Sequence, residues 1–220
     1  MKTANLIGAT GLVGAQLLKL LLADSRFEKI RVFGRRSCGV KGEKIEEHII
    51  DFDKPESWQG LVTGDVLFST LGTTIKQAGS QAQQRKIDYS YQYHFAEAAS
   101  ANGVPFYVLV SAPGADPKSR IFYTQIKGEL ERDVRKMRFN GMALLRPGLL
   151  AGARKDVRSG EVMGYRLLKF FNALGMFKKY RPIHGRIVAQ AMINAAIEAK
   201  PGAAVYTLDE VFALAGPPKG

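Results

Sequence analysis

The sequence predicts an α/β fold built around a doubly wound parallel sheet, and three observations lead to this prediction. An apolar segment, residues 2–7, runs directly into a glycine-rich turn and then into an amphipathic segment, residues 15–22. Further apolar segments of strand length alternate with helix-like segments, which favours parallel strands joined by helical crossovers. One of these segments, residues 66–71, is mostly apolar, as a strand buried on both faces should be.

The length and composition fit one domain. The chain has 220 residues, of which 46% are hydrophobic and 24% charged, and this is enough to bury one sizeable core. We expect a single domain over residues 1–220, in which residues 147–220 contribute a small substrate-side or lid region. No apolar run reaches the roughly 18 residues of a membrane helix and the first strand leaves no room for a signal peptide, so we expect a cytoplasmic protein. The single cysteine, Cys38, cannot form an internal disulfide.

The chain is strongly basic, with 32 Lys and Arg against 20 Asp and Glu and a net charge of +12. Such an excess favours anionic ligands. The basic residues are spread along the chain and no nucleic-acid-binding motif is recognisable, so nucleic acid is not the expected partner. A basic surface combined with a phosphate-rich cofactor explains the charge more simply.

The glycine-rich turn predicts a phosphate-binding site. The first N–H groups of the following helix have no partner within that helix, and the positive end of the helix dipole attracts a pyrophosphate. Gly8 would allow a tight turn, Gly11 a close approach of phosphates to the backbone, and Gly14 close packing of helix and strand. The spacing G-x-x-G-x-x-G differs from the G-x-G-x-x-G fingerprint, and a glycine-rich turn without a ligand is the alternative. The cofactor-binding residues predicted in this turn are Gly8, Thr10, Gly11, Leu12, Val13 and Gly14.

The second expected strand, residues 29–33, ends at Gly34, Arg35 and Arg36. An NAD-binding fold of this type carries an acidic residue there, which binds the ribose 2′-hydroxyl. The sequence has two arginines instead, and guanidinium groups match a phosphate in shape and charge. Arg35 and Arg36 therefore predict binding of the 2′-phosphate of NADP(H). Ordinary loop charges are the alternative.

The next two expected strands, residues 47–50 and 66–71, also end at candidate cofactor-binding positions. The glycine after the second strand would let the backbone approach a ligand at the carboxyl edge of the sheet, where open α/β sheets bind ligands. The aspartate after the first strand could lie near an adenine ring or simply cap a helix. The predicted contacts are Asp51, Phe52, Leu71, Gly72 and Thr73.

A second candidate site lies in the middle of the chain. Ser111 closes a strand expected at residues 106–110, and Tyr123 and Lys127 follow at the start of a helix expected at residues 123–137. The i, i+4 spacing puts tyrosine and lysine on one helical face. A hydroxyl, a phenol and an ammonium would together form a proton-transfer site for carbonyl reduction, because the ammonium favours the phenolate form. An exposed surface pair is the alternative.

The last third of the chain is expected to complete the fold. A sixth strand, residues 142–145, ends before Pro147, and a basic loop follows at residues 151–158. Residues 161–177 predict an amphipathic helix that could form a lid, pack on the core, contact a second subunit or lie on a membrane. His184 is expected to be structural rather than a metal ligand. We further expect a helix at residues 186–199, an edge strand at residues 205–208 and a disordered end from Gly216.

Taken together, these motifs resemble the short-chain dehydrogenase/reductase superfamily, and more narrowly its atypical group that includes the Tat-interacting oxidoreductase and its bacterial relatives. The resemblance extends over about residues 2–200. It rests on residues 8–14, 34–36, 69–74, 110–111, 123–131 and 145–150, followed by Gly152 and Arg154.

This resemblance implies an NADP(H)-binding Rossmann fold in which Tyr123 is the general acid/base. Lys127 would promote the phenolate form of the tyrosine and hold the nicotinamide ribose. Ser111 would orient the substrate carbonyl, and Pro147 would lie at the cofactor. The resemblance thus assigns three catalytic residues, and it implies no metal.

Two positions depart from the family pattern. Ser111 is followed by Ala112, where many relatives have paired serines. If the family role belongs to the second position, the serine function is missing. Asp88 stands where many members have an asparagine early in the fourth helix, which leaves open whether the proton relay is complete.

The sequence favours an NADP(H)-dependent oxidoreductase that acts on a small carbonyl or hydroxyl compound. Two alternatives stay open. One is an NADP(H)-binding regulatory or interaction protein with weak or no catalysis. The other is a nucleotide-sugar epimerase-like enzyme, against which the short region after residue 150 argues, although a fold by itself does not decide function. The expected partner is a small-molecule substrate, and a homodimer is compatible with the sequence.

Overall fold

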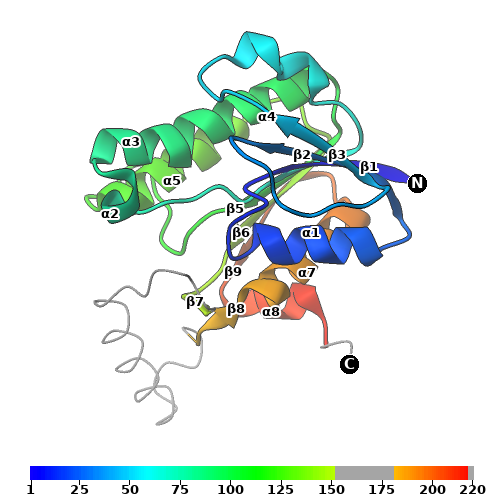
Figure 1. Ribbon diagram of the computed structural model, residues 1–220. Coiled ribbons are helices and arrows are strands. Elements are labelled where there is room, and N and C mark those ends of the chain that lie inside the picture. The colour runs from blue at the N-terminus through cyan, green and yellow to red at the C-terminus, as the bar shows by residue number, and fades with distance from the viewer. Residues whose placement is uncertain (152–180, 218–220) are drawn as a thin grey trace.

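The computed structural model describes residues 1–151 and 181–217. Within these residues, seven parallel strands form one sheet in the order β3-β2-β1-β4-β5-β6-β9, with helices on both faces (Figure 1). The predicted doubly wound α/β fold is confirmed. The strands are β1 (Lys2–Ile7), β2 (Phe27–Gly34), β3 (Ile45–Ile49), β4 (Val66–Ser69), β5 (Phe106–Val110), β6 (Gly141–Arg146) and β9 (Gly202–Thr207).

The strand order reverses between β1 and β4, and such a reversal creates the crevice in which open α/β sheets bind ligands. β1 pairs with β2 on one side and with β4 on the other. In this register Ile7 lies opposite both Phe33 and Ser69, so the loops that follow the three strands leave the sheet at the same edge. Segments that are distant in the sequence therefore meet at the carboxyl ends of β1, β2 and β4.

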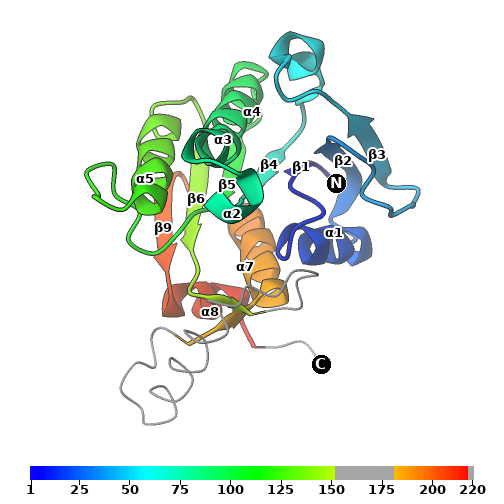
Figure 2. The same cartoon turned by 60° about the vertical axis from the view of Figure 1, so that its left-hand side comes forward.

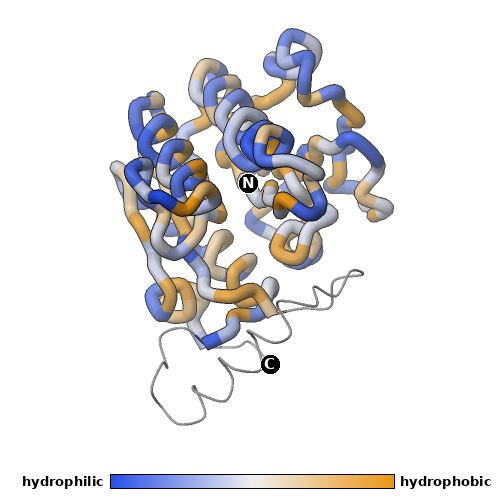
Figure 3. The backbone as a smooth tube through the Cα atoms, turned by 90° about the vertical axis from the view of Figure 1, so that its left-hand side faces the viewer, coloured by the Kyte–Doolittle hydropathy of each residue, from blue (hydrophilic) through white to orange (hydrophobic). Residues whose placement is uncertain are grey.

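Helices bury both faces of the sheet (Figures 1 and 2). On one face lie α1 (Gly14–Ala23), α7 (Gly185–Glu198) and α8 (Asp209–Ala215), and on the other lie α4 (Tyr91–Ala101) and α5 (Phe122–Val134). α1 buries Leu17, Leu18 and Leu21, whose helical spacing forms an apolar stripe facing the sheet. Figure 3 shows that hydrophobic and hydrophilic residues alternate along the helices. The apolar side chains thus form one buried cluster on each side of the sheet.

The segment between β4 and β5 is a broken helix, whereas the sequence predicted a polar segment followed by one continuous helix. It consists of α2 (Ile75–Ala78), α3 (Gln81–Arg85), a π-helical turn η3 (Lys86–Ser90) and α4. The side chains of Thr74 and Ser80 cap α2 and α3 by accepting hydrogen bonds from backbone N–H groups in their first turns. Two short 3₁₀ turns, η1 (Pro55–Ser57) and η2 (Gln59–Leu61), precede β4. A π turn interrupts the regular helical ladder and occurs often at functional sites.

The chain leaves the sheet after β6, at Pro147, as predicted. β7 (Leu150–Ala151) then pairs with β8 (Ile183–His184) beside α8 (Figure 1). The His184 ring caps α7 by accepting a hydrogen bond from Arg186 N at 3.4 Å, a structural role. The predicted edge strand is β9, which begins earlier than expected, and α8 was not predicted.

Some expectations lie outside the described residues: the amphipathic helix at residues 161–177 and most of the loop at residues 151–158. The division into one domain with a lid region at residues 147–220 stays a prediction. Within that range, α7 and β9 belong to the layers of the main sheet.

Candidate functional site

The turn between β1 and α1 has the geometry of an anion cradle. Gly8 has a φ of +86°, and Gly11 N donates to the Gly8 carbonyl oxygen at 3.0 Å, which closes the turn. α1 has neither a side-chain cap nor an acidic residue in its first turn. Among the described residues, no hydrogen-bond acceptor meets the backbone N–H groups of Leu12, Val13 and Gly14. These donors are therefore free to bind a pyrophosphate.

A Cβ atom at any of the three glycines of this turn would come very close to neighbouring atoms. A Cβ on Gly8 or on Gly14 would lie 2.6 Å from Thr70 Oγ1, and a Cβ on Gly14 would also collide with the Gly8 carbonyl oxygen. A Cβ on Gly11 would come within 3.3 Å of the same carbonyl oxygen. Gly8 and Gly14 thus let the turn pack against the loop after β4, and Gly11 lies close to the Gly8 carbonyl oxygen within the turn. These residues fit a bound dinucleotide.

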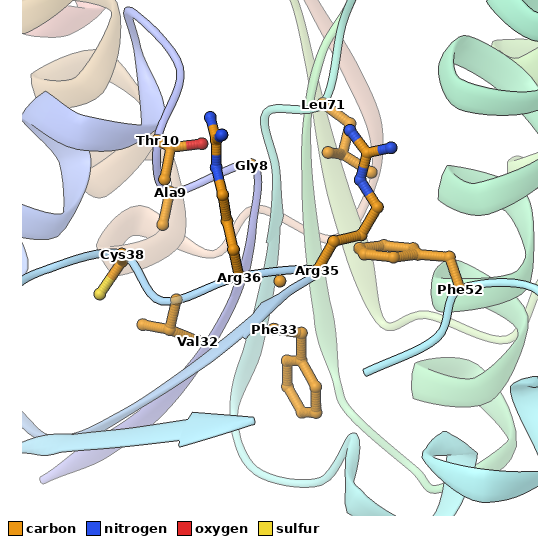
Figure 4. A pocket seen from close by; sticks show the side chains of 11 residues that line it. Gly8, Ala9, Thr10, Val32, Phe33, Arg35, Arg36, Cys38, Phe52 and Leu71 are labelled. Carbon is orange, nitrogen blue, oxygen red and sulfur yellow. The ribbon is translucent and has the colours of Figure 1, made fainter. Parts of the chain in front are cut away.

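Beside the cradle lies an open cavity of about 440 Å³ (Figure 4). Its walls carry two guanidinium groups and, among the described residues, no carboxylate. In Figure 4 the Arg36 side chain extends on the side of Thr10, and the Arg35 side chain extends on the side of Leu71 and Phe52. Such a wall suits an anionic group. The predicted residues that line the cavity are Gly8, Thr10, Arg35, Arg36, Phe52 and Leu71.

Other cavity residues were not predicted as contacts. Val32, Phe33 and Gly34 could have been found, because they end a strand at the carboxyl edge of the sheet. Ala9 lies inside the predicted motif, but it was not singled out. Cys38 lies in the loop after β2, and nothing in the sequence pattern marks it as a cavity residue.

Several predicted cofactor residues lie outside this cavity. The Asp51 carboxylate accepts a hydrogen bond from Asp53 N at 3.0 Å, so its geometry is that of a turn residue before η1. Pro147 directly follows β6. Thr73 N donates to the Asp88 carboxylate, and Gly72 lies beside that carboxylate. Contacts of these residues with a cofactor stay predictions.

Of the three predicted catalytic residues, Tyr123 and Lys127 lie on α5, and Ser111 lies just after β5. α5 begins at Phe122, so Tyr123 is in its first turn and Lys127 follows one turn later. Tyr123 is 39% exposed, whereas Lys127 is 2% exposed. Ser111 directly follows β5, and its buried Oγ has no hydrogen-bond partner in the described part of the chain. A buried hydroxyl without a partner is costly, and a ligand oxygen would satisfy it.

Lys127 forms a buried ion pair with Asp88, which lies on the π turn. The Lys127 Nζ atom is 3.0 Å from Asp88 Oδ1. The other carboxylate oxygen, Oδ2, accepts a hydrogen bond from Thr73 N at 3.1 Å. Burial disfavours the charged lysine, but Asp88 and Tyr123 outweigh burial and raise the pKa of Lys127 above its ordinary value. The structure thus brings a charged lysine to the loop after β4, at the same edge as the glycine cradle.

A second ion pair fixes α5 on the sheet. Glu131, one turn after Lys127, accepts hydrogen bonds from Arg146 Nε at 2.9 Å and Arg146 Nη2 at 2.6 Å. Arg146 Nη2 also donates to the carbonyl oxygen of Ala115, in the loop between β5 and α5, at 3.0 Å. The hydrogen bonds to Glu131 raise the pKa of Arg146, although partial burial opposes this effect. Sequence reasoning missed this pair, because its two members lie 15 residues apart on a helix and a strand, and no local spacing connects them.

Comparison with known proteins identifies the class of this chain. A family model described as NAD(P)H-binding matches residues 8–160. Because this match covers most of the chain, the chain belongs to this NAD(P)H-binding family. The predicted resemblance to the atypical short-chain dehydrogenase/reductase group is thereby confirmed.

Two relatives are similar over most of their lengths. Protein FMP52-1, mitochondrial, of Scheffersomyces stipitis is 37% identical over 202 residues, which are 89% of this chain and 88% of the relative. Protein HTATIP2 of Rattus norvegicus is 35% identical over 177 residues, 79% of this chain and 72% of the relative.

Solved structures share the fold. The Bordetella bronchiseptica enzyme WbmH in complex with NAD+ aligns with a TM-score of 0.72 at 16% identity, over 94% of this chain and 76% of that one. The UDP-N-acetylglucosamine 4-epimerase from Methanobrevibacter ruminantium aligns with a TM-score of 0.70 at 14% identity, over 96% and 80%. At these identities the likeness concerns the fold alone.

The expected cytoplasmic location is wrong. The FMP52 relatives from Scheffersomyces stipitis, Coccidioides immitis and Emericella nidulans are named mitochondrial proteins, and these names contradict the expectation. That expectation was based on the lack of a recognisable targeting segment, and this observation was not sufficient to predict the location. Within residues 1–151 and 181–217, no helix has the length and apolar character needed to cross a membrane.

Proposed function

We propose that this protein is an NADP(H)-dependent oxidoreductase acting on a small carbonyl or hydroxyl compound. The observation that carries the proposal is the buried Lys127 ammonium. It lies one turn after Tyr123 and is connected through Asp88 to the loop at the edge of the sheet that holds the glycine cradle. A lysine held charged in a buried place beside a tyrosine is suited to proton transfer.

The preference for NADP(H) over NAD(H) is supported by the two arginines of the cavity wall. Guanidinium groups bind a 2′-phosphate bidentately, whereas a 2′-hydroxyl would call for a carboxylate. The described part of the cavity wall carries two guanidinium groups and no carboxylate.

Measured dissociation constants test this preference. We expect Arg35→Ala and Arg36→Ala each to weaken NADPH binding about tenfold and NADH binding much less, because only NADPH carries the 2′-phosphate. Arg26→Ala is the matched control, since Arg26 immediately precedes the opposite end of the same strand, β2. Equal affinity of the wild-type protein for the two dinucleotides would contradict the preference.

The chemistry assigned to the chain's own residues is carbonyl reduction. When bound, the nicotinamide supplies the hydride that reduces the carbonyl carbon. Tyr123 donates its phenolic proton to the carbonyl oxygen as negative charge develops there. The Lys127 ammonium stabilises the phenolate that remains, and the Ser111 hydroxyl donates a hydrogen bond to the same carbonyl oxygen.

A screen of carbonyl compounds that follows NADPH absorbance tests this chemistry. We expect Tyr123→Phe and Lys127→Met to lower turnover about 10²- to 10⁴-fold, the usual contribution of a positioned proton donor, with NADPH still bound by Tyr123→Phe. Tyr93→Phe, on α4 and lining a separate surface pocket, should retain wild-type turnover. Turnover that survives loss of the Tyr123 phenol would remove the assignment.

A second candidate function is an NADP(H)-binding regulatory protein with weak or no catalysis. The exposure of Tyr123, 39%, favours it, because a proton donor is expected to be enclosed when it acts. Tight NADPH binding without turnover of any carbonyl compound would support this candidate over the oxidoreductase.

A further inference from the structure

The first turn of α7 packs on the backbone of the glycine cradle. Figures 1 and 2 show α7 beside α1, and the two helices are in contact. α7 begins at Gly185, which is buried, and a Cβ at this position would lie 2.5 Å from the Leu12 carbonyl oxygen and 3.1 Å from its carbon. The backbone of Gly185 is not in the left-handed region, so its conformation does not require glycine. The close approach to Leu12 is therefore the reason that no side chain fits there.

This contact determines the direction in which one peptide group of the cradle faces. The peptide bonds of the described residues are trans, and in a trans peptide the C=O and the following N–H point in opposite directions. Because the Leu12 carbonyl group faces α7, the Val13 N–H faces away from it. The Val13 N–H is one of the cradle donors that meet no acceptor within the described residues. The packing of α7 thus orients a donor that is free to bind a ligand.

Hydrogen bonds do not fix the same peptide group. The Gly11 carbonyl oxygen accepts from Ala15 N at 2.9 Å, and the Val13 carbonyl oxygen accepts from Leu17 N at 2.8 Å. Between these two, no backbone N–H of the described residues donates to the Leu12 carbonyl oxygen. The Leu12–Val13 peptide therefore depends on packing against α7 for its orientation.

α7 is the less movable partner in this contact. Its first turn is capped by His184, whose Nδ1 accepts from Arg186 N, and its buried face packs on α1 and on the sheet. The cradle, by contrast, is exposed at Gly11. A side chain added at Gly185 would therefore displace the Leu12–Val13 peptide and turn its N–H.

We propose that Gly185 is a positioning residue for cofactor binding. Its lack of a side chain lets α7 hold the Leu12–Val13 peptide so that the Val13 N–H can donate to the pyrophosphate. This inference rests on the proposed function, because it takes the cradle as the pyrophosphate site of NADP(H). It gives a helix from the far end of the chain a part in binding the cofactor, although that helix does not line the cavity.

The affinities for two fragments of the cofactor, measured by calorimetry on the full-length protein, test the proposal. ADP carries the pyrophosphate without the 2′-phosphate, and 2′-AMP carries the 2′-phosphate without the pyrophosphate. We expect Gly185→Ala to weaken binding of ADP and of NADPH about tenfold, as for the loss of one hydrogen bond to a charged group. Binding of 2′-AMP should be unchanged, because it uses the arginine pair.

Gly141→Ala is the matched control. A Cβ at Gly141 would also collide with a backbone carbonyl oxygen, that of Lys200, but Gly141 begins β6 and lies at the opposite edge of the sheet from the cradle. We expect this variant to lose stability in urea denaturation and to bind all three ligands with wild-type affinity. Wild-type affinity for ADP in Gly185→Ala, or equal losses for ADP and 2′-AMP, would overturn the proposal.

A measurement on the wild-type protein remains if Gly185→Ala does not fold. Residual dipolar couplings give the direction of the Val13 N–H bond in the free protein and at saturating NADPH. We expect the same direction in both states, because the packing of α7 sets it before the ligand binds, and a reorientation would overturn the proposal.

The outcomes also separate this inference from the proposed function. If Gly185→Ala loses affinity for ADP and NADPH as expected but the wild-type protein reduces no carbonyl compound, the oxidoreductase activity fails and this inference stands. If Gly185→Ala binds ADP normally while the wild-type protein reduces a carbonyl compound, only this inference fails.

Discussion

At Gly14 the backbone of α1 approaches the preceding turn so closely that a single methyl group has no room. The sequence alone predicted close packing of helix and strand there, and the distances to Thr70 and Gly8 agree with it. The same motif did not reveal that the packing partner is the loop after β4, because sequence spacing carries no information about contacts between distant segments.

Replacing Gly14 tests the packing of the cradle. We expect Gly14→Ala to lower the free energy of unfolding by about 1–3 kcal/mol, the usual cost of overpacking, and to weaken NADPH binding by displacing the first turn of α1. Gly60→Ala is the control, because a Cβ at Gly60 meets nothing within 4 Å. Chemical denaturation and calorimetric titration measure the two effects. A Gly14→Ala protein as stable as Gly60→Ala would contradict the packing described for the cradle.

For some single residues, the sequence predicted the position but not the contacts. Asp88 was recognised only as a departure from a family pattern, because nothing in the sequence shows that its carboxylate reaches Lys127 across two elements. Arg35 and Arg36 could be placed at the cavity because they directly follow a strand whose end fixes their position. The sequence left open whether Tyr123 and Lys127 form an exposed pair, and in the structure Tyr123 is exposed whereas Lys127 is buried.

At the scale of elements, α5 is the helix that carries the site, and its position depends on charged contacts at its surface. Tyr89 OH, on the π turn, donates to Asp133 Oδ2, near the end of α5, at 3.0 Å. Burial and this contact raise the pKa of Tyr89 to about 12. Hydrogen bonds from Arg132 and, less, from Lys136 and Tyr89 hold the pKa of Asp133 below its ordinary value despite partial burial. The contact therefore joins the π turn to α5.

The lowered pKa of Asp133 makes a prediction about pH. A carboxyl group whose pKa is lower in the folded than in the unfolded protein stabilises the fold above the unfolded pKa and ceases to do so as the pH falls. We expect Asp133→Asn to be about 1–2 kcal/mol less stable than wild type at pH 7, and the difference to shrink below about pH 4. Urea denaturation at several pH values measures it, with Glu28→Gln as an exposed control. A difference that is independent of pH would refute the stated cause.

The elements were predicted with uneven success, and the reasons are physical. Strands that end in glycine or proline were placed within a few residues, because these residues interrupt a strand locally. The π turn was not predicted, since its apolar spacing differs little from that of an α-helix over five residues. α8 was missed because its seven residues are too few to show a clear period.

At the scale of the whole molecule, the order of the strands decides where a site can form. The reversal between β1 and β4 brings together the cradle, the arginine pair and the 70–74 loop, and α5 adds Lys127 to the same edge through Asp88. The sequence predicted the class of fold, because alternating strands and helices leave few arrangements. It could not predict that β9, from the far end of the chain, pairs with β6.

The central claim is that the amino end of α1 binds the pyrophosphate of a dinucleotide, and the backbone amides of that turn report on it directly. A ¹H–¹⁵N titration of the full-length protein with NADPH is the measurement. We predict saturable shifts of the Gly11, Leu12, Val13 and Gly14 amides, and small shifts in α8, which lies outside the crevice. Unchanged amides at residues 8–14, at NADPH concentrations that saturate binding by calorimetry, would contradict the claim.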